Sequence, residues 1–421
     1  QRPSLAIGGG VAGGHTNGLA SLSAILALNL LTGALGREGG VRLNGGPPIE
    51  GLPIGGRATG PAEWQQLADR LRTSPVPAVL IYGADPVYSL PPSLGFGEAL
   101  PRAQLVASFS SFMDETTGLA DLIMPSHLPL EDWGSDVPDP GPGFPVVTIQ
   151  QPVLRPFFDT RSFEDILLAV GEELGGAVRA ALPWRTLEEL LREDAGKLQR
   201  LGRGSVREAD FERFWVKLLQ QGGWWDETPA AAPAAAPAPT SPAGLAAGCP
   251  AARFAGDERE YPYNLIVFEH HALGGGELAH LPWLQATPDP ITTVVWRSWV
   301  EVNPGLAGRL GLVEGDVVAV ETPQGRVEVP VYVHPAAPPT VLAMPMGQGH
   351  RGHGRWAIDR GVNPIALLAP LTDEATGSLA YAATRARLVK TGRRSRLPKL
   401  EGNVPAYQVP GEHVLKVTRE G

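Results

Sequence analysis

Cysteine is almost absent from this sequence: Cys249 is the single one among 421 residues. One thiol cannot form a disulfide within the chain, and an iron–sulfur cluster or a thiolate zinc site needs several thiolates. Cys249 lies in a stretch rich in alanine and proline, so we interpret it as an incidental thiol. Disulfide scaffolds and clusters held by this chain alone are therefore excluded.

Charge and long apolar runs are also scarce. Charged residues make up 19% of the chain and the net charge is −9, which argues against the clustered basic face of a nucleic-acid-binding protein. The most apolar segment, residues 19–35, contains Ser21, Ser23, Asn29 and Thr32 and falls short of the ~20 apolar residues of a membrane span. We predict a buried helix there and no transmembrane segment.

Short apolar segments alternate with helical patterns in the first half of the chain. We predict strands at 5–8, 78–86, 103–112 and 120–125, and helices at 18–35, 62–73, 161–174, 185–201 and 208–222. This alternation indicates parallel βαβ units, whose ligands bind at the carboxyl ends of the strands. We assign residues 1–228 to one α/β domain of this kind.

The composition changes after residue 228. Residues 229–252 are predicted to form a proline- and alanine-rich linker, and residues 253–392 a compact β-barrel-like domain. The barrel strands are predicted at 263–270, 298–303, 316–323, 325–334, 340–346 and 383–392. The tetrapeptide "TPQG" predicts a tight hairpin turn between two of them, and residues 393–421 are predicted to form a C-terminal tail.

A glycine-rich segment opens the chain: Gly8, Gly10 and Gly13 satisfy the G-x-G-x-x-G spacing, in which glycines let a pyrophosphate approach the backbone. A dinucleotide site of this type also needs an acidic residue about 20 positions further on, at the end of a second strand. Glu38 is the sole acid in range, and it lies between glycines after a helix. The pattern does not favour an NAD or FAD site, and a tight strand-to-helix turn is the alternative.

Motifs in colinear order over residues 1–392 resemble the C-terminal half of the molybdopterin oxidoreductases, the dimethyl-sulfoxide-reductase-like group. The resemblance rests on "TNG…AILALNLLTGALGREGG", "GADPVYSLP", "SFMDETTGLADLIMPSHLPLEDWGS" and "MPMGQGHRGHGRWAIDRGVNPIALL". It implies an α/β fold in which a Rossmann-like parallel-sheet domain is followed by a double-psi β-barrel.

Three segments look most like the molybdopterin-oxidoreductase-like part of the iron–sulfur subunit of alternative complex III, namely "PWLQATPDPITTVVWRSWVEVNP", "GQGHRGHGRWAIDRGVNP" and "LLAPLTDEATGSLAYAATRARLVKTG". The resemblance implies a cofactor-free scaffold in a membrane quinol-oxidising complex, peripheral on the periplasmic side, with the other subunits as partners. Iron–sulfur clusters are then expected only in a flanking region, and no catalytic residue or metal in this chain. The chain itself, which begins at Gln1 without a signal peptide, is expected to be an internal piece of a larger protein.

The alternative is the C-terminal half of a catalytic molybdenum oxidoreductase that binds molybdopterin guanine dinucleotide. For that case the resemblance implies cofactor contacts from Gly9, Gly10, His15, Thr16, Asn17, Gly83, Asp85, Pro86, Asp114, Glu115, Thr116, Gln348, His350, Arg355 and Asn363. Ordinary roles compete with this one, because Asp85 and Asp114 follow strands and can cap helices, and Asn363 precedes a proline in a turn.

Histidines and a possible catalytic triad complete the set of candidates. A metal site is suggested by His270, His271, His280, His350 and His353. The loop around the last two is rich in glycine and carries no carboxylate at helical spacing, so we predict polar loop or interface histidines instead. Ser126 and His127 are adjacent in the chain and do not form a triad.

Overall fold

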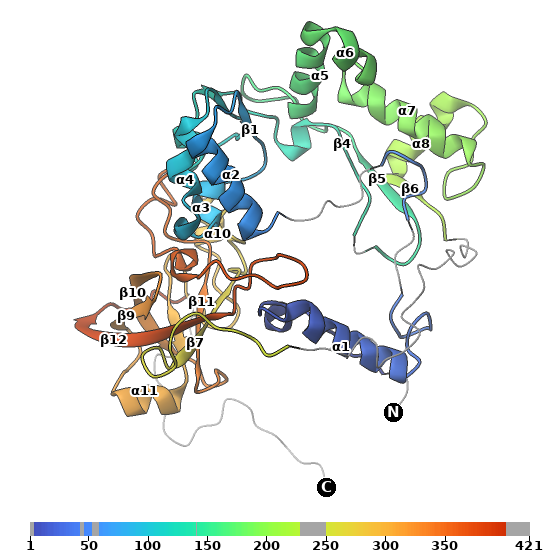
Figure 1. Ribbon diagram of the computed structural model, residues 1–421. Helices are drawn as coiled ribbons and strands as arrows, with labels where there is room; N and C mark the ends of the chain where they lie inside the picture. Colours follow the sequence, from blue (N-terminus) through green and yellow to red (C-terminus); the bar gives the residue numbers. More distant parts are fainter. Residues whose placement is uncertain (1–3, 43–45, 53–58, 140, 228–249, 401–421) are drawn as a thin grey trace.

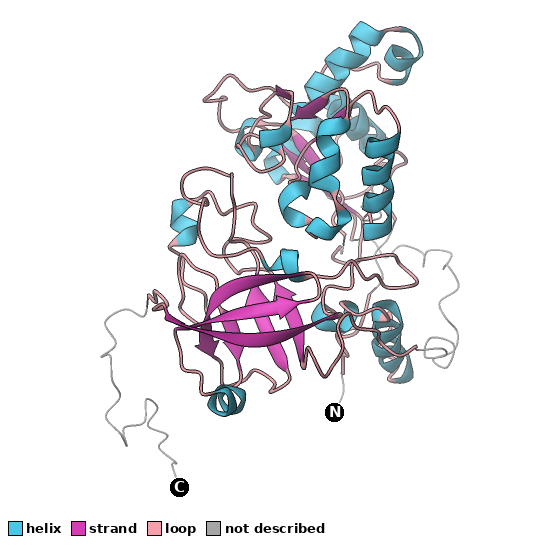
Figure 2. Cartoon of the chain, turned by 60° about the vertical axis from the view of Figure 1, so that its left-hand side comes forward, coloured by secondary structure: helices cyan, strands magenta, loops and turns pink. Residues whose placement is uncertain are grey.

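The computed structural model describes residues 4–42, 46–52, 59–139, 141–227 and 250–400 (Figures 1 and 2). Most of the predicted linker, at 228–249, and most of the predicted tail, at 401–421, lie outside the described residues. The domain limits at these two places therefore stay predictions.

A three-stranded parallel sheet forms the centre of the first α/β unit. Its strands are β1 (Val79–Ile81), β2 (Val106–Ser108) and β3 (Leu122–Ile123), in the order β1-β2-β3. Around it lie α2 (Pro61–Thr73), α3 (Pro86–Ser89), η2 (Pro92–Leu94), α4 (Phe96–Ala99), η3 (Leu100–Arg102) and η4 (Thr117–Leu119). Helix α2 starts with a proline, whose missing N–H suits the first helical position, and it buries Ala68 and Leu71 against Phe96 and Val106.

A second, antiparallel sheet was not predicted from the sequence. It comprises β4 (Gly134–Asp136), β5 (Val146–Gln150) and β6 (Gly223–Trp225). Helix η5 (Pro129–Glu131) precedes β4, and between β5 and β6 the chain forms α5 (Phe163–Leu174), α6 (Gly176–Ala181), α7 (Leu187–Arg200) and α8 (Phe211–Gln221). Trp215 and Trp224 are buried between this sheet and α7 and α8. A side chain on Gly223 would collide with the backbone of Val147, so glycine is what allows β6 to pair.

The C-terminal unit is a closed six-stranded barrel. Its strands are β7 (Tyr263–Phe268), β8 (Val300–Val302), β9 (Asp316–Thr322), β10 (Gly325–Val333), β11 (Val341–Pro345) and β12 (Thr384–Arg394), and the accompanying helices are α10 (Pro282–Gln285), α11 (Pro304–Leu310) and η6 (Pro364–Leu367). Leu265, Val300, Val320 and Leu342 lie in its core. The predicted hairpin is confirmed, because Thr322 pairs with Gly325 across a two-residue loop.

The predicted fold class, a Rossmann-like parallel-sheet domain followed by a double-psi β-barrel, is confirmed by this parallel sheet and by the closed barrel with its mixed parallel and antiparallel pairs. The predicted helices at 62–73, 161–174, 185–201 and 208–222 correspond to α2, α5, α7 and α8. The predicted strands at 78–86 and 103–112 are shorter than expected, because their second halves form the turns that carry the polar residues described below.

The predicted strand at 5–8 is wrong. These residues run beside α1 (Gly18–Leu31) without a strand partner, and η1 (Gly10–Gly13) follows them. The side-chain amide of Asn29 satisfies the backbone instead, since it accepts from the Ala6 N–H at 2.9 Å and donates to the Ala6 carbonyl at 2.8 Å. One buried amide thus takes the place of a neighbouring strand.

The prediction that the helix within 18–35 is buried is also wrong. Helix α1 extends from the side of the barrel (Figure 1), and Leu19, Leu28 and Leu31 are exposed, Leu31 to 68%. The apolar residues of α1 occur on every side of the helix, so packing one face against the rest of the chain leaves other apolar residues exposed. None of the helices in the described ranges is long and apolar enough to cross a membrane.

The barrel core should dominate the stability of the C-terminal unit. Leu342 on β11 has 0% of its surface exposed and Leu400 has 58%. We expect Leu342→Ala to lower the free energy of unfolding by about 2–5 kcal/mol, because it leaves a cavity among packed strands. The matched control Leu400→Ala should change it by less than about 0.5 kcal/mol. Urea unfolding followed by tryptophan fluorescence measures both, and equal losses would contradict the assigned core.

Candidate functional site

Two loops at the carboxyl ends of β1 and β2 meet. After β1 the chain turns at Gly83, which has φ 63°, and Asp85 caps the short helix α3. After β2, Thr116 donates from its backbone N–H to Oδ1 of Asp85 at 3.1 Å, and its hydroxyl donates to the same oxygen. Asp114 accepts from the N–H of Thr117 at 2.7 Å and starts η4. The turns after the two strands are therefore joined by hydrogen bonds.

Glu115 connects the parallel-sheet unit to the barrel. Its Oε1 accepts from the backbone N–H groups of Arg351 at 2.6 Å and Gly352 at 3.0 Å, in the loop that follows β11. Its Oε2 lies 3.0 Å from Nδ1 of His350. Burial opposes ionisation of this carboxyl, but the hydrogen bonds from His350 and from the backbone outweigh it, so the pKa of Glu115 lies well below its usual range.

The side chain of His350 is buried and contacts Glu115, Gly276 and Tyr88. Its side chain is 2% exposed, and its Nε2 lies 3.1 Å from the carbonyl oxygen of Gly276. The ring stacks on Tyr88 with centroids 3.8 Å apart. Tyr88 in turn donates its hydroxyl to the Gln348 carbonyl at 2.9 Å and accepts at its own carbonyl from the Asn363 amide at 2.8 Å. These contacts join α3 to the barrel loops.

A pair of histidines, His280 and His353, lies beside His350. His353 is 6% exposed, and its Nε2 lies 2.9 Å from Nδ1 of His280 and 3.0 Å from the carbonyl oxygen of Glu277. Its Nδ1 is buried and has no partner in the described part of the chain. Burial, followed by the neighbouring charge of His353, lowers the pKa of His280 to about 4. At neutral pH this pair is therefore uncharged.

The pKa of Asp85 is shifted in the opposite direction to that of Glu115. Burial is the main cause that raises it to about 7; the Thr116 hydrogen bond opposes this rise, and the charge of Asp114 together with the hydrogen bond and charge of Glu115 adds to it. Its Oδ2 is buried without a hydrogen-bond partner among the described residues. One possible ligand atom from each of Asp85, Glu115 and His350 lies within 4.8 Å of the other two, which is the spacing of a candidate metal site.

A cavity of about 560 Å³ opens at these strand ends. Its wall includes Gly83, Asp85, Tyr88, Asp114, Glu277, His350 and His353. A second cavity of about 500 Å³, mostly apolar, lies between the glycine turn and the barrel and includes Gly10, Val11, Ile266 and Tyr381. Ser89 lines both cavities, which makes them neighbours.

The first predicted loop does not reach the strand-end cavity. Gly10 accepts from the Tyr381 hydroxyl at 2.7 Å, and Gly9 precedes it with φ 142°. His15 packs edge-on against Phe254, the Thr16 hydroxyl accepts from the Arg253 N–H, and the Asn17 amide donates to the Pro250 carbonyl. These three side chains attach the start of α1 to the segment that follows the linker.

The remaining predicted residues do not line the strand-end cavity. Pro86 is buried at the start of α3, and Gln348 pairs through its amide with Gln285 at 2.7 Å. Arg355 is exposed, with its guanidinium over the ring of Trp356. The structure thus brings Gly83, Asp85, Asp114, Glu115 and His350 together and leaves Arg355 in solvent. The sequence analysis did not single out Tyr88 and Gln285, although both lie within segments that carry the family resemblance.

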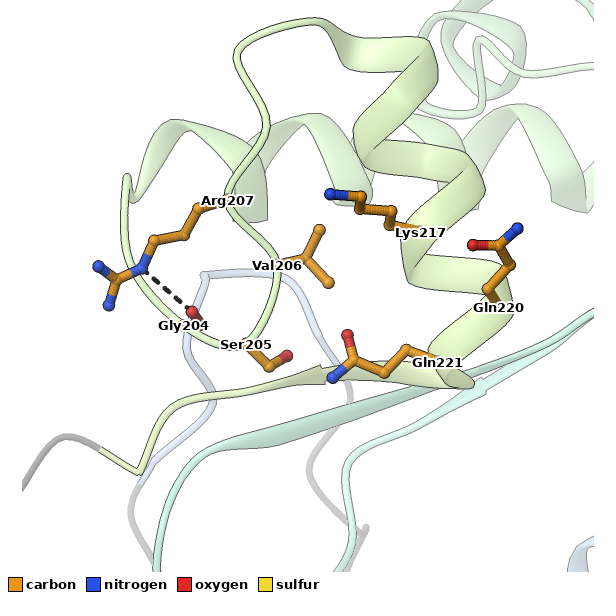
Figure 3. Close-up of a pocket in the computed structure, with 7 residues that line it drawn as sticks. All are labelled: Gly204, Ser205, Val206, Arg207, Lys217, Gln220 and Gln221. Carbon is orange, nitrogen blue, oxygen red and sulfur yellow. Dashed lines mark hydrogen bonds between the residues drawn. The ribbon is translucent and has the colours of Figure 1, made fainter.

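A larger cavity of about 650 Å³ lies elsewhere, between the loop after α7 and helix α8 (Figure 3). Both of its cations are already bonded: Arg207 donates to the Gly204 carbonyl at 3.2 Å, and Lys217 pairs with Glu208. It contains none of the predicted site residues and none of the perturbed acids. The strand-end cavity is therefore the candidate functional site.

Comparisons with known proteins find a matching family model and similar chains. Residues 286–385 match the family described as the Molydopterin dinucleotide binding domain. The chain is 27% identical, over 89% of its length, to the menaquinone reductase, molybdopterin-binding-like subunit of Nitratidesulfovibrio vulgaris, of which it covers 51%. It is 24% identical, over 72% of its length, to the arsenate respiratory reductase molybdopterin-containing subunit ArrA of Shewanella sp. ANA-3, of which it covers 43%. The chain spans about half the length of these relatives.

A solved structure confirms the fold alone. Acetylene hydratase from Pelobacter acetylenicus superposes with a TM-score of 0.59 at 18% identity, over 79% of this chain and 46% of that one. The matched share is larger than either predicted domain, so the likeness extends over parts of both.

Removal of the Tyr88 hydroxyl tests how much its hydrogen bond to the barrel unit contributes to stability. We expect Tyr88→Phe to lower the free energy of unfolding by about 1–3 kcal/mol, because the buried Gln348 carbonyl loses its donor while the ring can still stack on His350. Tyr82→Phe, at an exposed tyrosine in the same cavity wall, is the control and should change it by less than about 0.5 kcal/mol. Denaturant titration of both variants provides the comparison, and a silent Tyr88→Phe would contradict the bridge.

Proposed function

Because the chain belongs to the molybdopterin oxidoreductase family and corresponds to its C-terminal region, we propose that it is a cofactor-free scaffold of a respiratory electron-transfer complex. More finely, it is the molybdopterin-oxidoreductase-like part of the iron–sulfur subunit in a membrane quinol-oxidising complex of the alternative complex III type. It lies at the periplasmic side of the membrane, and its function is to bind the other subunits.

The charge of the strand-end cavity carries this proposal. A molybdopterin dinucleotide contains a pyrophosphate, which proteins bind with arginine, lysine and free backbone N–H groups. The described residues that line the cavity include three acidic side chains, those of Asp85, Asp114 and Glu277, and neither lysine nor arginine. The apolar neighbouring cavity has Glu269 as its one charged residue among those described. An anionic group would meet carboxylates in both places.

The side chains that the resemblance implies as cofactor contacts are also engaged within the protein. Gln348 is paired with Gln285, Asn363 with Tyr88, and Glu115 with the loop after β11. Arg355, the one guanidinium in the implied set, lies in solvent over Trp356. The residues present therefore do not fit a pyrophosphate-bearing dinucleotide, and no chemistry is assigned to one.

The name of the Nitratidesulfovibrio relative supports the setting, because it is a molybdopterin-binding-like subunit of a menaquinone reductase and matches 89% of the chain. A single cysteine means that any iron–sulfur cluster of the complex is held by other residues than these 421. Contact surfaces for other subunits are available, because α1 exposes leucines, and Phe157 and Phe158 are exposed to 84% and 73%.

The alternative function is the C-terminal half of a catalytic molybdenum oxidoreductase. Its support is the match of residues 286–385 to a dinucleotide-binding domain and the similarity to a molybdopterin-containing arsenate reductase subunit. It requires that the engaged side chains release their present partners to admit the cofactor.

Cofactor analysis separates the two functions. The protein is purified from its natural host, denatured and oxidised, and the extract is examined for pterin fluorescence, with molybdenum, tungsten and iron measured by mass spectrometry. We expect no stoichiometric pterin, molybdenum or tungsten, because the cavity offers no cation to a pyrophosphate. One pterin and one metal per chain would favour the catalytic alternative.

The scaffold function also predicts a dependence on the exposed helix. We expect the double substitution Leu28→Asp with Leu31→Asp on α1 to release the chain from its complex, because carboxylates cannot be buried in an apolar contact without loss of binding. Val313→Asp, at a similarly exposed position of the barrel domain, is the control. Sedimentation of solubilised membranes shows whether the chain stays with the complex, and retention of the α1 variant would exclude this helix as a contact.

A further inference from the structure

We propose that Asp85, Glu115 and His350 bind one divalent metal ion, best matched by zinc, which ties the parallel-sheet unit to the barrel. The three residues come from the loop after β1, the loop after β2 and the loop after β11. One ligand atom from each lies within 4.8 Å of the other two. No other group of three histidine, cysteine, aspartate or glutamate side chains within the described ranges has this spacing.

Each of the three proposed ligand side chains is oriented by hydrogen bonds to an atom other than the one proposed to bind the ion. Oδ1 of Asp85 accepts from Thr116, which leaves Oδ2, and Oε1 of Glu115 accepts from the N–H groups of Arg351 and Gly352, which leaves Oε2. Nε2 of His350 lies 3.1 Å from the Gly276 carbonyl, so that Nδ1 faces the two carboxylates. Histidine ligands of metals are typically held in this way through the ring nitrogen that does not bind the ion.

Two buried atoms at the site have no partner among the described residues. One is Oδ2 of Asp85, the atom that the arrangement leaves for the ion. The other is Nδ1 of His353, whose side chain is 6% exposed, lines the same cavity and stacks on His350 with ring centroids 4.9 Å apart. Buried polar atoms without a partner are rare in folded proteins and indicate a missing ligand or water.

The charge of the cavity also favours a cation. Asp114 and Glu277 line the cavity in addition to Asp85, and no lysine or arginine is among its described residues. Burial of carboxylates is costly unless an opposite charge compensates them. A divalent ion supplies this compensation, and it replaces the proton that Oε2 of Glu115 and Nδ1 of His350 share at 3.0 Å.

The donor set identifies the class of ion. Calcium and magnesium prefer oxygen ligands alone, whereas zinc binds imidazole nitrogen together with carboxylate oxygen. Zinc bonds of about 2.0–2.2 Å place neighbouring ligand atoms about 3.3 Å apart, which is within the 4.8 Å limit that the three atoms already satisfy. Three protein ligands leave a fourth position of a tetrahedral zinc ion for water.

Zinc binding by the 421-residue chain tests the proposal. After treatment with chelator, isothermal titration with Zn²⁺ should show one site per chain, and thermal unfolding should shift to higher temperature because the ion binds the folded state. We expect Glu115→Gln and Asp85→Asn each to weaken binding by at least about 10-fold, because even the loss of a group that only hydrogen-bonds a metal ligand costs this much. Both substitutions keep the oxygen that accepts the existing backbone hydrogen bonds.

Glu131→Gln is the matched control. Glu131 also accepts from two backbone N–H groups, those of Leu128 and Phe157, but it lies outside the cluster, so the variant should bind zinc as the unchanged chain does. Absence of a site with one zinc per chain overturns the proposal, and so does binding that survives in both Glu115→Gln and Asp85→Asn or that is lost equally in Glu131→Gln. Circular dichroism of the metal-free variants identifies any that do not fold. The outcome is independent of the pterin analysis, which measures a different cofactor.

Discussion

The carboxylate of Glu115 is the contact on which the arrangement of the whole site depends. It reaches from the parallel-sheet unit to His350 of the barrel unit, 235 positions further along the chain. It also accepts hydrogen bonds from two backbone N–H groups of the loop that follows β11. That loop contains Gly347, Gly349, His353 and Gly354 at positive φ, so its backbone cannot form a regular element of its own. Hydrogen bonds to a charged acceptor are worth about 1.5–3 kcal/mol each, enough to hold such a loop in one conformation.

Local patterns in the sequence predicted the elements whose periodicity is strong. Helices α2, α5, α7 and α8 have one apolar face each, and the barrel hairpin has its turn residues in the expected place, so these predictions did not depend on distant contacts. The strand predicted at 5–8 failed for the opposite reason, because an apolar segment becomes a strand only if another strand is beside it. Here the side chain of Asn29 is beside it.

The predictions for the site divide in the same way between local patterns and distant contacts. Asp85, Glu115 and His350 were identified through the family resemblance, but their mutual position depends on how two units pack, which neither spacing nor composition contains. The histidine loop was interpreted as too rich in glycine to fix two metal ligands by itself. In the structure both rings are held from outside the loop, because Glu115 binds the loop backbone and because His280 and the Glu277 carbonyl contact the second ring. Contacts from outside the loop supply the order that the loop lacks.

The order of strands in the barrel has a consequence for how the chain acquires its structure. Strands β1, β2 and β3 are close in sequence, so the parallel sheet can form early during synthesis. The barrel cannot close until β12, at residues 384–394, has been made, because that strand pairs with both β7 and β9. Long-range pairings of this kind slow folding. Until then the parallel sheet lacks the contacts of Glu115 with the loop after β11. The site is therefore among the last parts of the molecule to form.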